Sequence, residues 1–188
     1  TLDLCSWFNE QSRLTARINT IKVSVDECLQ ELRALGWTVD QDEYIPECIY
    51  IDGHQGHLEK ARPVLDGHIT FMDKASMLVA HVVNPQPGER ILDCCAAPGG
   101  KSMHMASLME NTGAIMSCDI YEHKLQLMQS NAERLGVSII SMKLQDGRTL
   151  PDSWINQFDR VLVDAPCSGL GILQKKLDMR WRKSRELL

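Results

Sequence analysis

The sequence predicts an α/β fold: a doubly wound parallel sheet covered by helices, preceded by a small N-terminal α+β domain. In the second half of the chain, short apolar strands alternate with helices, which is the pattern of a parallel sheet. The first 60 or so residues instead combine a segment of alternating apolar and polar residues with one capped helix. Glycines and acids follow the later strands, at the sheet edge where such folds bind ligands.

The first half contains four recognisable segments. Residues 2–14 predict a helix, and residues 15–23 alternate apolar and polar side chains as a half-buried strand does. A short strand is expected at 49–51, closed by an Asp-Gly turn. Residues 53–68 are rich in glycine, histidine and proline and predict a linker.

Between those strands lies a helix with clear start and stop signals. Ser24 is typical of an N-cap, and Glu27 stands three residues later in the capping-box position. Gly36 is the stop signal, because glycine readily adopts the left-handed conformation that ends helices. The helix is therefore expected to begin after Ser24 and to end before Gly36.

The second half predicts three helices and four strands from apolar periodicity, glycines and prolines. The expected helices span residues 73–83, 99–109 and 122–135. The expected strands span residues 90–94, 114–118, 137–142 and 160–163. Parallel strands joined by helices require right-handed crossovers, so the strand ends should share one edge of the sheet.

Composition excludes several classes of protein. Apolar residues make up 44% of the chain, yet no apolar run approaches the roughly 20 residues that cross a membrane, and no signal-peptide pattern begins it. The seven cysteines form no C-x-x-C pair, which argues against a zinc site or a disulfide framework. We therefore expect reduced thiols, no bound metal, no membrane partner and a cytoplasmic location.

The charge is unevenly distributed although the net charge is only −5. Acidic residues dominate the first 89 residues, and basic residues gather near the end of the chain at Lys175, Lys176, Arg180, Arg182, Lys183 and Arg185. Such a cluster is a candidate phosphate-binding patch. A solvated helix face explains it equally well on composition alone.

A loop of small residues follows the first strand of the second half, with the sequence DCCAAPGGK from Asp93 to Lys101. Small side chains let a ligand approach the backbone, and the next helix offers free N–H groups at its positive end. The loop is not the G-x-G-x-x-G fingerprint of dinucleotide-binding proteins, nor the G-x-x-x-x-G-K-[ST] loop that binds nucleoside triphosphates. A dehydrogenase and a nucleotide triphosphatase are therefore disfavoured.

Acidic residues follow the remaining three strands at Asp119, Asp146 and Asp164. Asp119 stands 19 residues after Gly100, the spacing at which an acid accepts hydrogen bonds from ribose hydroxyls. A single aspartate at a strand end is usually a cap or a turn residue. Three in corresponding positions after a glycine-rich loop favour a cofactor that contains a nucleoside.

Cys167 belongs to the sharpest motif of the chain, DAPCSG from Asp164 to Gly169. Pro166 stiffens the turn, which would hold the thiol at the ligand edge of the sheet. Many free cysteines are instead buried structural residues. The adjacent acid and the glycine-rich turn favour a functional cysteine.

Five segments together resemble the RNA 5-methylcytosine methyltransferases of the Sun/Fmu/RsmB group, among which the bacterial 16S ribosomal RNA enzymes are the most similar. DCCAAPGGKS at 93–102 resembles the cofactor motif of that family, and DAPCSGLG at 164–171 resembles its Pro-Cys motif. RINT at 17–20, FMDKAS at 71–76 and KKLDMRW at 175–181 are similar to three shorter segments. Met72 and Leu177 replace the family's usual Gln and Pro.

The resemblance implies a Rossmann-like class I methyltransferase sheet of about four strands in the order 3-2-1-4. It divides the chain into an RNA-positioning domain at 1–66 and a domain at 67–188 that binds S-adenosyl-L-methionine. Asp119 would bind the ribose of that cofactor, Asp146 the adenine amino group, and Asp164 would lie near the methionine amino group and the target base. The cofactor's methionine and ribose would be wrapped by Cys95, Ala96, Ala97, Pro98, Gly99, Gly100 and Lys101.

The family's reaction proceeds through a thiolate that adds to carbon 6 of cytosine, so that carbon 5 can attack the sulfonium methyl. The resemblance implies that the nucleophile is a second cysteine, in a Thr-Cys motif that comes later in the family's sequences. Cys167 would then be the catalytic residue that assists product release. This sequence contains no Thr-Cys pair. We therefore expect a truncated form of an enzyme that methylates carbon 5 of a cytosine in RNA, with 16S ribosomal RNA as the favoured substrate. The alternative is a non-catalytic module that binds S-adenosyl-L-methionine or RNA.

Truncation would leave the strand at 160–163 as an apolar edge. Exposed edges of this kind invite pairing with another chain. Self-association or a disordered C-terminus is therefore expected.

Overall fold

The computed structural model describes residues 6, 9, 12–54, 56–167, 169, 178 and 181. The chain divides into two compact units, one formed by the segments Thr1–Arg13 and Ala165–Leu188 and the other by Leu14–Asp164. Every helix and strand named below belongs to the second unit. The basic cluster at 175–185 and the expected C-terminal disorder lie outside the described residues, as does most of the expected helix at 2–14.

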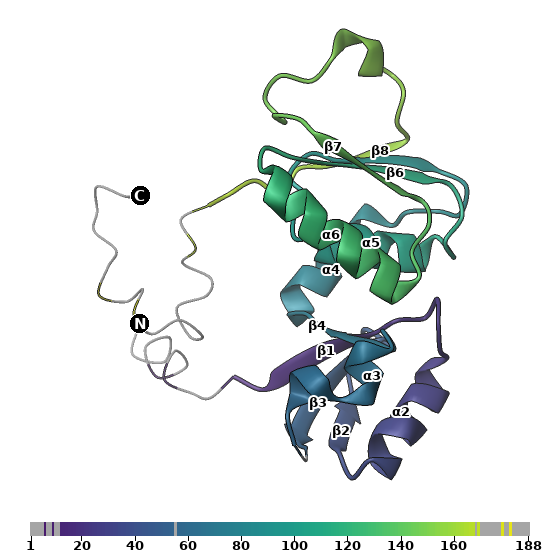
Figure 1. Ribbon diagram of the computed structural model, residues 1–188, viewed down its shortest axis with the longest axis vertical. Helices are drawn as coiled ribbons and strands as arrows, with labels where there is room; N and C mark the ends of the chain where they lie inside the picture. Colours follow the sequence, from purple (N-terminus) through teal and green to yellow (C-terminus); the bar gives the residue numbers. More distant parts are fainter. Residues whose placement is uncertain are drawn as a thin grey trace. The chain divides into compact units, whose positions relative to one another are not determined.

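The N-terminal part of the second unit is an antiparallel sheet of four strands in the order β2-β3-β1-β4 (Figure 1). Its strands are β1 (Leu14–Ile18), β2 (Thr38–Gln41), β3 (Cys48–Gly53) and β4 (Ile69–Phe71). Helix α2 (Val25–Ala34) buries Cys28, Leu29 and Leu32 against the sheet, where they share one core with Ile49 and Ile69. This arrangement confirms the small α+β unit.

The start and stop signals of α2 are confirmed. The Ser24 side chain accepts a hydrogen bond from the backbone N–H of Glu27, and the Glu27 carboxylate accepts one from the backbone N–H of Ser24. The helix ends at Ala34, and Gly36 adopts a φ of 78° just beyond it. The capping box thus satisfies two N–H groups that the helix itself leaves unpaired.

Three expectations for this part of the chain were wrong. Leu14 begins a strand and does not end a helix, and β1 stops at Ile18 rather than at residue 23. It stops there because Asn19 turns the chain, its backbone carbonyl accepting from the N–H of Lys22. The expected linker at 53–68 contains the 3₁₀ turn η1 (Leu58–Lys60) and the short helix α3 (Arg62–Leu65).

The C-terminal part of the second unit is a parallel sheet in the order β7-β6-β5-β8, which confirms the expected 3-2-1-4 order. Its strands are β5 (Arg90–Asp93), β6 (Ala114–Asp119), β7 (Ile140–Leu144) and β8 (Arg160–Leu162). The helices are α4 (Lys74–Val83), α5 (Gly100–Leu108) and α6 (Glu122–Leu135). Strand β7 begins three residues later than expected, and the other bounds differ by at most two residues.

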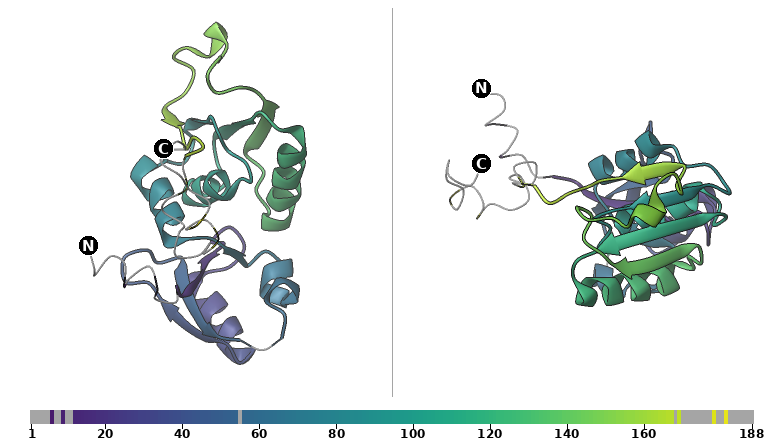
Figure 2. Two further views of the ribbon diagram at one scale, coloured as in Figure 1. Left: turned by 90° about the vertical axis from the view of Figure 1, so that its left-hand side faces the viewer. Right: turned by 90° about the horizontal axis from the view of Figure 1, so that it is seen from above.

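Helices α4, α5 and α6 cover one face of the parallel sheet (Figures 1 and 2). The connection from β7 to β8, which includes the 3₁₀ turn η2 (Asp152–Trp154), crosses the other face. Buried methionines fill the layer between sheet and helices, notably Met103, Met105, Met109 and Met128. No helix of the described residues is both long and apolar enough to span a membrane.

Strand β8 lies at one edge of the parallel sheet and pairs with β5. Val161 is 54% exposed and Val163, just past the strand, is 64% exposed. The expected apolar edge is therefore present in the described part of the chain.

Candidate cofactor-binding site

Four aspartates gather where the strands of the parallel sheet end. Asp93 and Asp119 are the last residues of β5 and β6, and Asp146 and Asp164 lie two residues beyond β7 and β8. Burial raises the pKa of the Cys95 thiol, and all four carboxylates raise it further. The loop that follows β5 is therefore surrounded by negative charge, as the strand-end pattern predicted.

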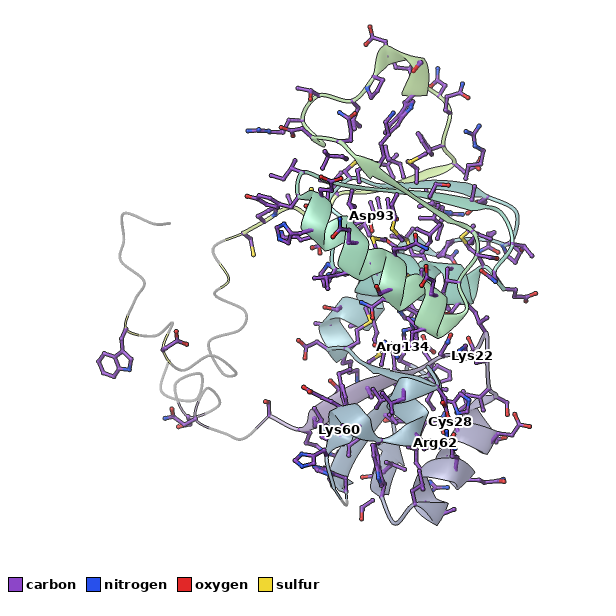
Figure 3. All side chains as sticks on the ribbon, viewed as in Figure 1. Lys22, Cys28, Lys60, Arg62, Asp93 and Arg134 are labelled. Atoms are coloured by element: carbon purple, nitrogen blue, oxygen red, sulfur yellow. The ribbon has the colours of Figure 1, made fainter. Side chains whose placement is uncertain are left out.

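Asp93 is the residue of this group that the sequence did not single out. Its side chain is buried and accepts a hydrogen bond of 2.7 Å from Ser102 Oγ, which in turn accepts one from Ser117 Oγ at 3.1 Å (Figure 3). Burial raises the pKa of Asp93 to about 6, against the opposing effect of the Ser102 hydrogen bond. Its position as the first acid of the motif could have identified it as the residue that fixes the loop to α5.

The small-residue loop crosses from β5 to α5 in a conformation that depends on glycine. The backbone N–H of Ala96 donates to the carbonyl of Cys118 at 2.8 Å, which ties the loop to β6. Gly99 has a φ of 98°, and a Cβ there would lie 2.8 Å from Cγ of Met128. Only glycine fits this position, because both the backbone angle and the contact exclude a side chain.

Helix α5 begins at Gly100 without a side-chain cap. A Cβ on Gly100 would have only the flexible end of Met72 within 4 Å, at 3.9 Å. The start of α5 is thus an accessible backbone surface with N–H groups and a positive dipole end, which suits a polar or negative ligand group.

Asp119 is held in place by the backbone around it. Its carboxylate accepts a hydrogen bond of 3.0 Å from the N–H of Tyr121, and its carbonyl accepts one of 3.0 Å from the N–H of Gln145. The second bond joins the ends of β6 and β7, so Asp119 and Asp146 keep a fixed spacing. The family resemblance assigns these two acids to the ribose and the adenine, and the structure places them at neighbouring strand ends.

Asp146 already has a partner in its own loop. Its carboxylate accepts hydrogen bonds from the backbone N–H of Arg148 at 2.9 Å and from the guanidinium of Arg148 at 2.6 Å. These bonds lower the pKa of Asp146 to about 2, so the group is ionised at neutral pH. A Cβ on Gly147 would lie 3.1 Å from the carbonyl oxygen of Cys94, which shows how closely this loop packs on β5.

Lys101 directs its ammonium group to Asp164, at 2.6 Å from the carboxylate. The contact joins the first turn of α5 to the residue that follows β8. Lys101 lies at the predicted site, but its Nζ is bound to an acid and not free for a ligand carboxylate. Cys167 is exposed and belongs to the other compact unit.

The segment RINT at 17–20, which resembles a segment of the family's RNA-positioning domain, is buried except for Thr20. Arg17 and Asn19 are both fully buried. The Asn19 amide donates hydrogen bonds to the carbonyls of Gly67 and Leu135, at 2.9 and 2.8 Å. Arg17 reaches α5. The alternation of apolar and polar residues could not reveal that Arg17 and Asn19 join distant elements, because their hydrogen-bond partners lie 48 to 116 residues further along the chain.

The residues around the loop fit a nucleoside-containing cofactor on two observations. First, the carboxylates of Asp119 and Asp146 lie at the ends of adjacent strands, where they can accept hydrogen bonds. Second, a Cβ on Gly100 at the start of α5 would meet only the flexible end of Met72 within 4 Å. Together with a parallel sheet of order β7-β6-β5-β8 under three helices, this site defines a Rossmann-like methyltransferase fold.

Comparison with known proteins places the chain in one family. Residues 80–187 match the family described as 16S rRNA methyltransferase RsmB/F, and residues 1–56 match the ferredoxin-like domain of the same proteins. The chain belongs to this RsmB/F methyltransferase family.

Individual relatives agree with that assignment. The chain is 39% identical over 170 residues to the probable ribosomal RNA small subunit methyltransferase B of Bacillus subtilis, covering 90% of this chain and 38% of that protein. It is 35% identical to a 28S rRNA (cytosine-C(5))-methyltransferase of Mus musculus, covering 95% of this chain and 23% of that protein.

A solved structure of a methyltransferase homolog from Pyrococcus horikoshii superposes with a TM-score of 0.79 at 28% identity, covering 92% of this chain and 56% of that one. The chain therefore spans well under half the length of the curated relatives named here.

Proposed function

We propose that this chain is the cofactor-binding part of an enzyme that transfers a methyl group from S-adenosyl-L-methionine to carbon 5 of a cytosine in RNA, with 16S ribosomal RNA in the cytoplasm as substrate. One observation carries the proposal. The small-residue loop follows β5, and Asp119 and Asp146 follow the next two strands, β6 and β7, at the edge of the sheet where such folds bind a nucleoside cofactor.

Each residue of the site would have a separate role in binding the cofactor or in the reaction. The backbone from Cys95 to Lys101 would hold the methionine and ribose, Asp119 would accept from the ribose hydroxyls, and Asp146 from the adenine amine. When bound, the cofactor supplies an electrophilic methyl group. Asp164, whose carboxylate is held by Lys101, would face the target base, and Cys167 would act in product release.

Titration calorimetry with S-adenosyl-L-methionine tests the site in the 188-residue chain. We expect binding of one molecule per chain, and a Kd that rises about tenfold or more in Asp119→Asn, because a hydrogen-bonded ribose contact is lost. Asp26→Asn is the matched control, since Asp26 is exposed in the first turn of α2. Unchanged affinity in Asp119→Asn would contradict the assignment.

Methyl transfer is a separate measurement. The sequence has no Thr-Cys pair, so we expect the 188-residue chain to bind the cofactor without transferring tritiated methyl groups to RNA. Transfer by this chain alone would show that another cysteine is the nucleophile. A cofactor-binding or RNA-binding module without catalysis is the second candidate, and the missing pair is the observation that favours it.

We make two further proposals, one for residues 1–66 and one for strand β8. Residues 1–66 would position RNA, and the edge strand β8 would pair with another polypeptide, because Val161 and Val163 leave its apolar side exposed. Light scattering over a range of concentrations tests the second proposal, and a monomer at all concentrations would contradict self-association.

A further inference from the structure

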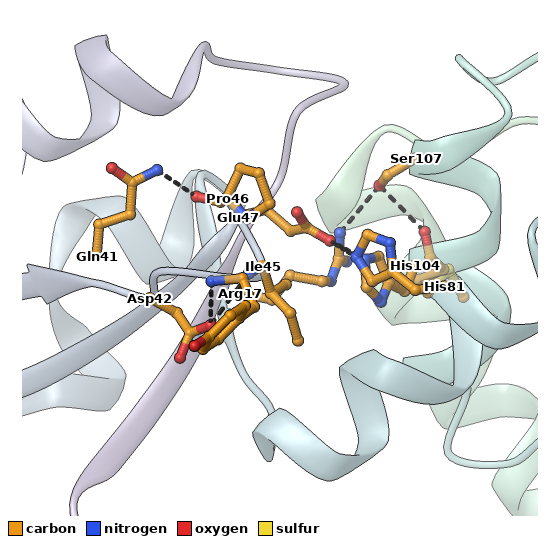
Figure 4. A network of polar contacts seen from close by, with 11 residues as sticks. Arg17, Gln41, Asp42, Ile45, Pro46, Glu47, His81, His104 and Ser107 are labelled. Atoms are coloured by element: carbon orange, nitrogen blue, oxygen red, sulfur yellow. Dashed lines mark hydrogen bonds and ion pairs between the residues drawn. The ribbon is translucent and has the colours of Figure 1, made fainter.

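Three side chains of types that bind metal ions converge outside the group of aspartates at the cofactor site. Glu47 immediately precedes β3, His81 lies in α4 and His104 lies in α5 (Figure 4). Oε1 of Glu47 is 2.6 Å from Nε2 of His81 and 2.6 Å from Nε2 of His104. One carboxylate oxygen thus faces two imidazole nitrogens, and the three atoms lie within 4.8 Å of one another.

We propose that Glu47, His81 and His104 form a site for one divalent transition-metal ion of the zinc class. Two imidazoles and one carboxylate are a common ligand set for zinc, with a water molecule as the fourth ligand. At metal–ligand distances of about 2.1 Å, tetrahedral ligand atoms lie roughly 3.4 Å apart. The present contacts need to open by less than about 1 Å to admit the ion.

Access comes from one side. The His104 side chain is fully buried and the Glu47 side chain is 9% exposed, whereas the His81 side chain is 33% exposed. Solvent therefore reaches the cluster past His81, which gives an ion an entry path. Three ligands on three different elements would tie the first sheet to α4 and α5 and raise the stability of the fold.

The alternative is a hydrogen-bonded cluster that binds no ion. The Glu47 carboxylate raises the pKa of the buried Arg17 guanidinium, and that guanidinium lowers the pKa of His104, so a positive charge lies near the cluster. This positive charge opposes a dication, so we expect a Kd in the micromolar range, weaker than the values of zinc sites without a neighbouring cation. The proposal does not depend on the proposed function, since none of the three ligands belongs to the cofactor site.

Calorimetric titration of the chelator-treated, reduced chain with Zn²⁺ alone, and visible spectra with Co²⁺ alone, test the site. We expect one ion per chain, a Co²⁺ spectrum of nitrogen and oxygen ligands, and a rise in Tm. His81→Ala should weaken binding about tenfold or more, since one of three protein ligands is lost. This variant is expected to fold because the side chain is partly exposed, and its Tm without metal checks that it does.

His68→Ala is the matched control. His68 Nδ1 is 2.7 Å from Glu31 Oε2 in a partly exposed pair without a third ligand, so its loss should leave metal affinity unchanged. Seven cysteines could bind the probe instead, and a Co²⁺–thiolate band would reveal this. Such a band, equal affinity in His81→Ala, or no binding at millimolar ion would each overturn the proposal.

Discussion

Arg17 on β1 donates a hydrogen bond of 2.9 Å from Nη1 to Oγ of Ser107 on α5, 90 residues further along the chain. The guanidinium is buried, and burial lowers its pKa to about 10. Its Nε and Nη2 have no hydrogen-bond partner among the described residues. The charge is balanced by Glu47, so the two sheets meet through a buried, nearly neutral polar cluster.

Arg17→Ala should lower the free energy of unfolding by about 3 kcal/mol or more, because it removes the positive charge that acts on the buried carboxylate of Glu47. Urea denaturation followed by circular dichroism measures the change. Arg33→Ala, at an exposed position in the last turn of α2, is the control and should cost much less. Equal effects of the two variants would show that the Arg17 charge contributes nothing specific.

The His104 imidazole should make stability depend on pH. Its pKa is lowered from 6.5 to about 4, so the unfolded chain binds more protons between these values. Stability from this group is therefore present above pH 6.5 and lost as pH falls to 4. The stability difference between wild type and His104→Asn should shrink over this range. A difference that is constant or grows as pH falls would contradict the assignment.

Asp93 should act in the opposite direction. Its pKa is raised from 3.8 to about 6, so the folded chain binds more protons between these values, and its contribution to stability falls as pH rises through them. Asp93→Asn removes this loss of stability with rising pH, because the asparagine side chain does not titrate. Wild type should therefore lose stability relative to the variant from pH 4 to pH 6, in urea titrations at fixed ionic strength. If the wild type instead gained stability relative to the variant over that range, the pKa of Asp93 would not be raised by burial.

Gly147→Ala should weaken cofactor binding, because the new Cβ would lie 3.1 Å from the Cys94 carbonyl oxygen and displace the loop that carries Asp146. We expect the Kd for S-adenosyl-L-methionine to rise about tenfold, measured by calorimetry. Gly56→Ala is an instructive control, since Gly56 has a φ of +76° but nothing within 4 Å. That variant should lose stability and keep its affinity.

Arg148→Ala should have the reverse effect on binding. The Arg148 guanidinium occupies the Asp146 carboxylate that we assign to the adenine amine. Its removal frees the acceptor, and because the pair is exposed we expect only about a two- to fivefold decrease in Kd. Weaker binding in Arg148→Ala would show that the guanidinium itself contacts the cofactor.

The parallel sheet could be predicted from sequence because its signals are local. Short apolar strands, the bounds of α6 and the acids at Asp119, Asp146 and Asp164 all depend on residues close in the chain. The onset of β7 was misplaced because Val137 and Ile139 are apolar yet precede the strand, where they pack against the helices. The order of the strands came from the family resemblance.

The polar cluster around Arg17 could not be predicted in this way. Glu47, His104 and Ser107 lie 30 to 90 residues from Arg17, and each alone reads as an ordinary polar residue of a strand end or helix. The short strands β2 and β4 were missed for a similar reason. Strand β4 has only three residues and pairs with β1, about 50 residues earlier.

Asn19 makes the stability of the N-terminal sheet depend on a helix that is synthesised much later. Its amide binds the carbonyl of Leu135, 116 residues later, and Lys22 binds the carbonyl of Arg134 through its ammonium group. During synthesis the first sheet therefore emerges from the ribosome long before the partners of its buried polar residues exist. In a nascent chain that ends before α6, the Asn19 amide lacks the carbonyl of Leu135 as an acceptor. The core around the buried Arg17 is then also incomplete. The N-terminal sheet is thus expected to gain its final stability only when α6 has been made.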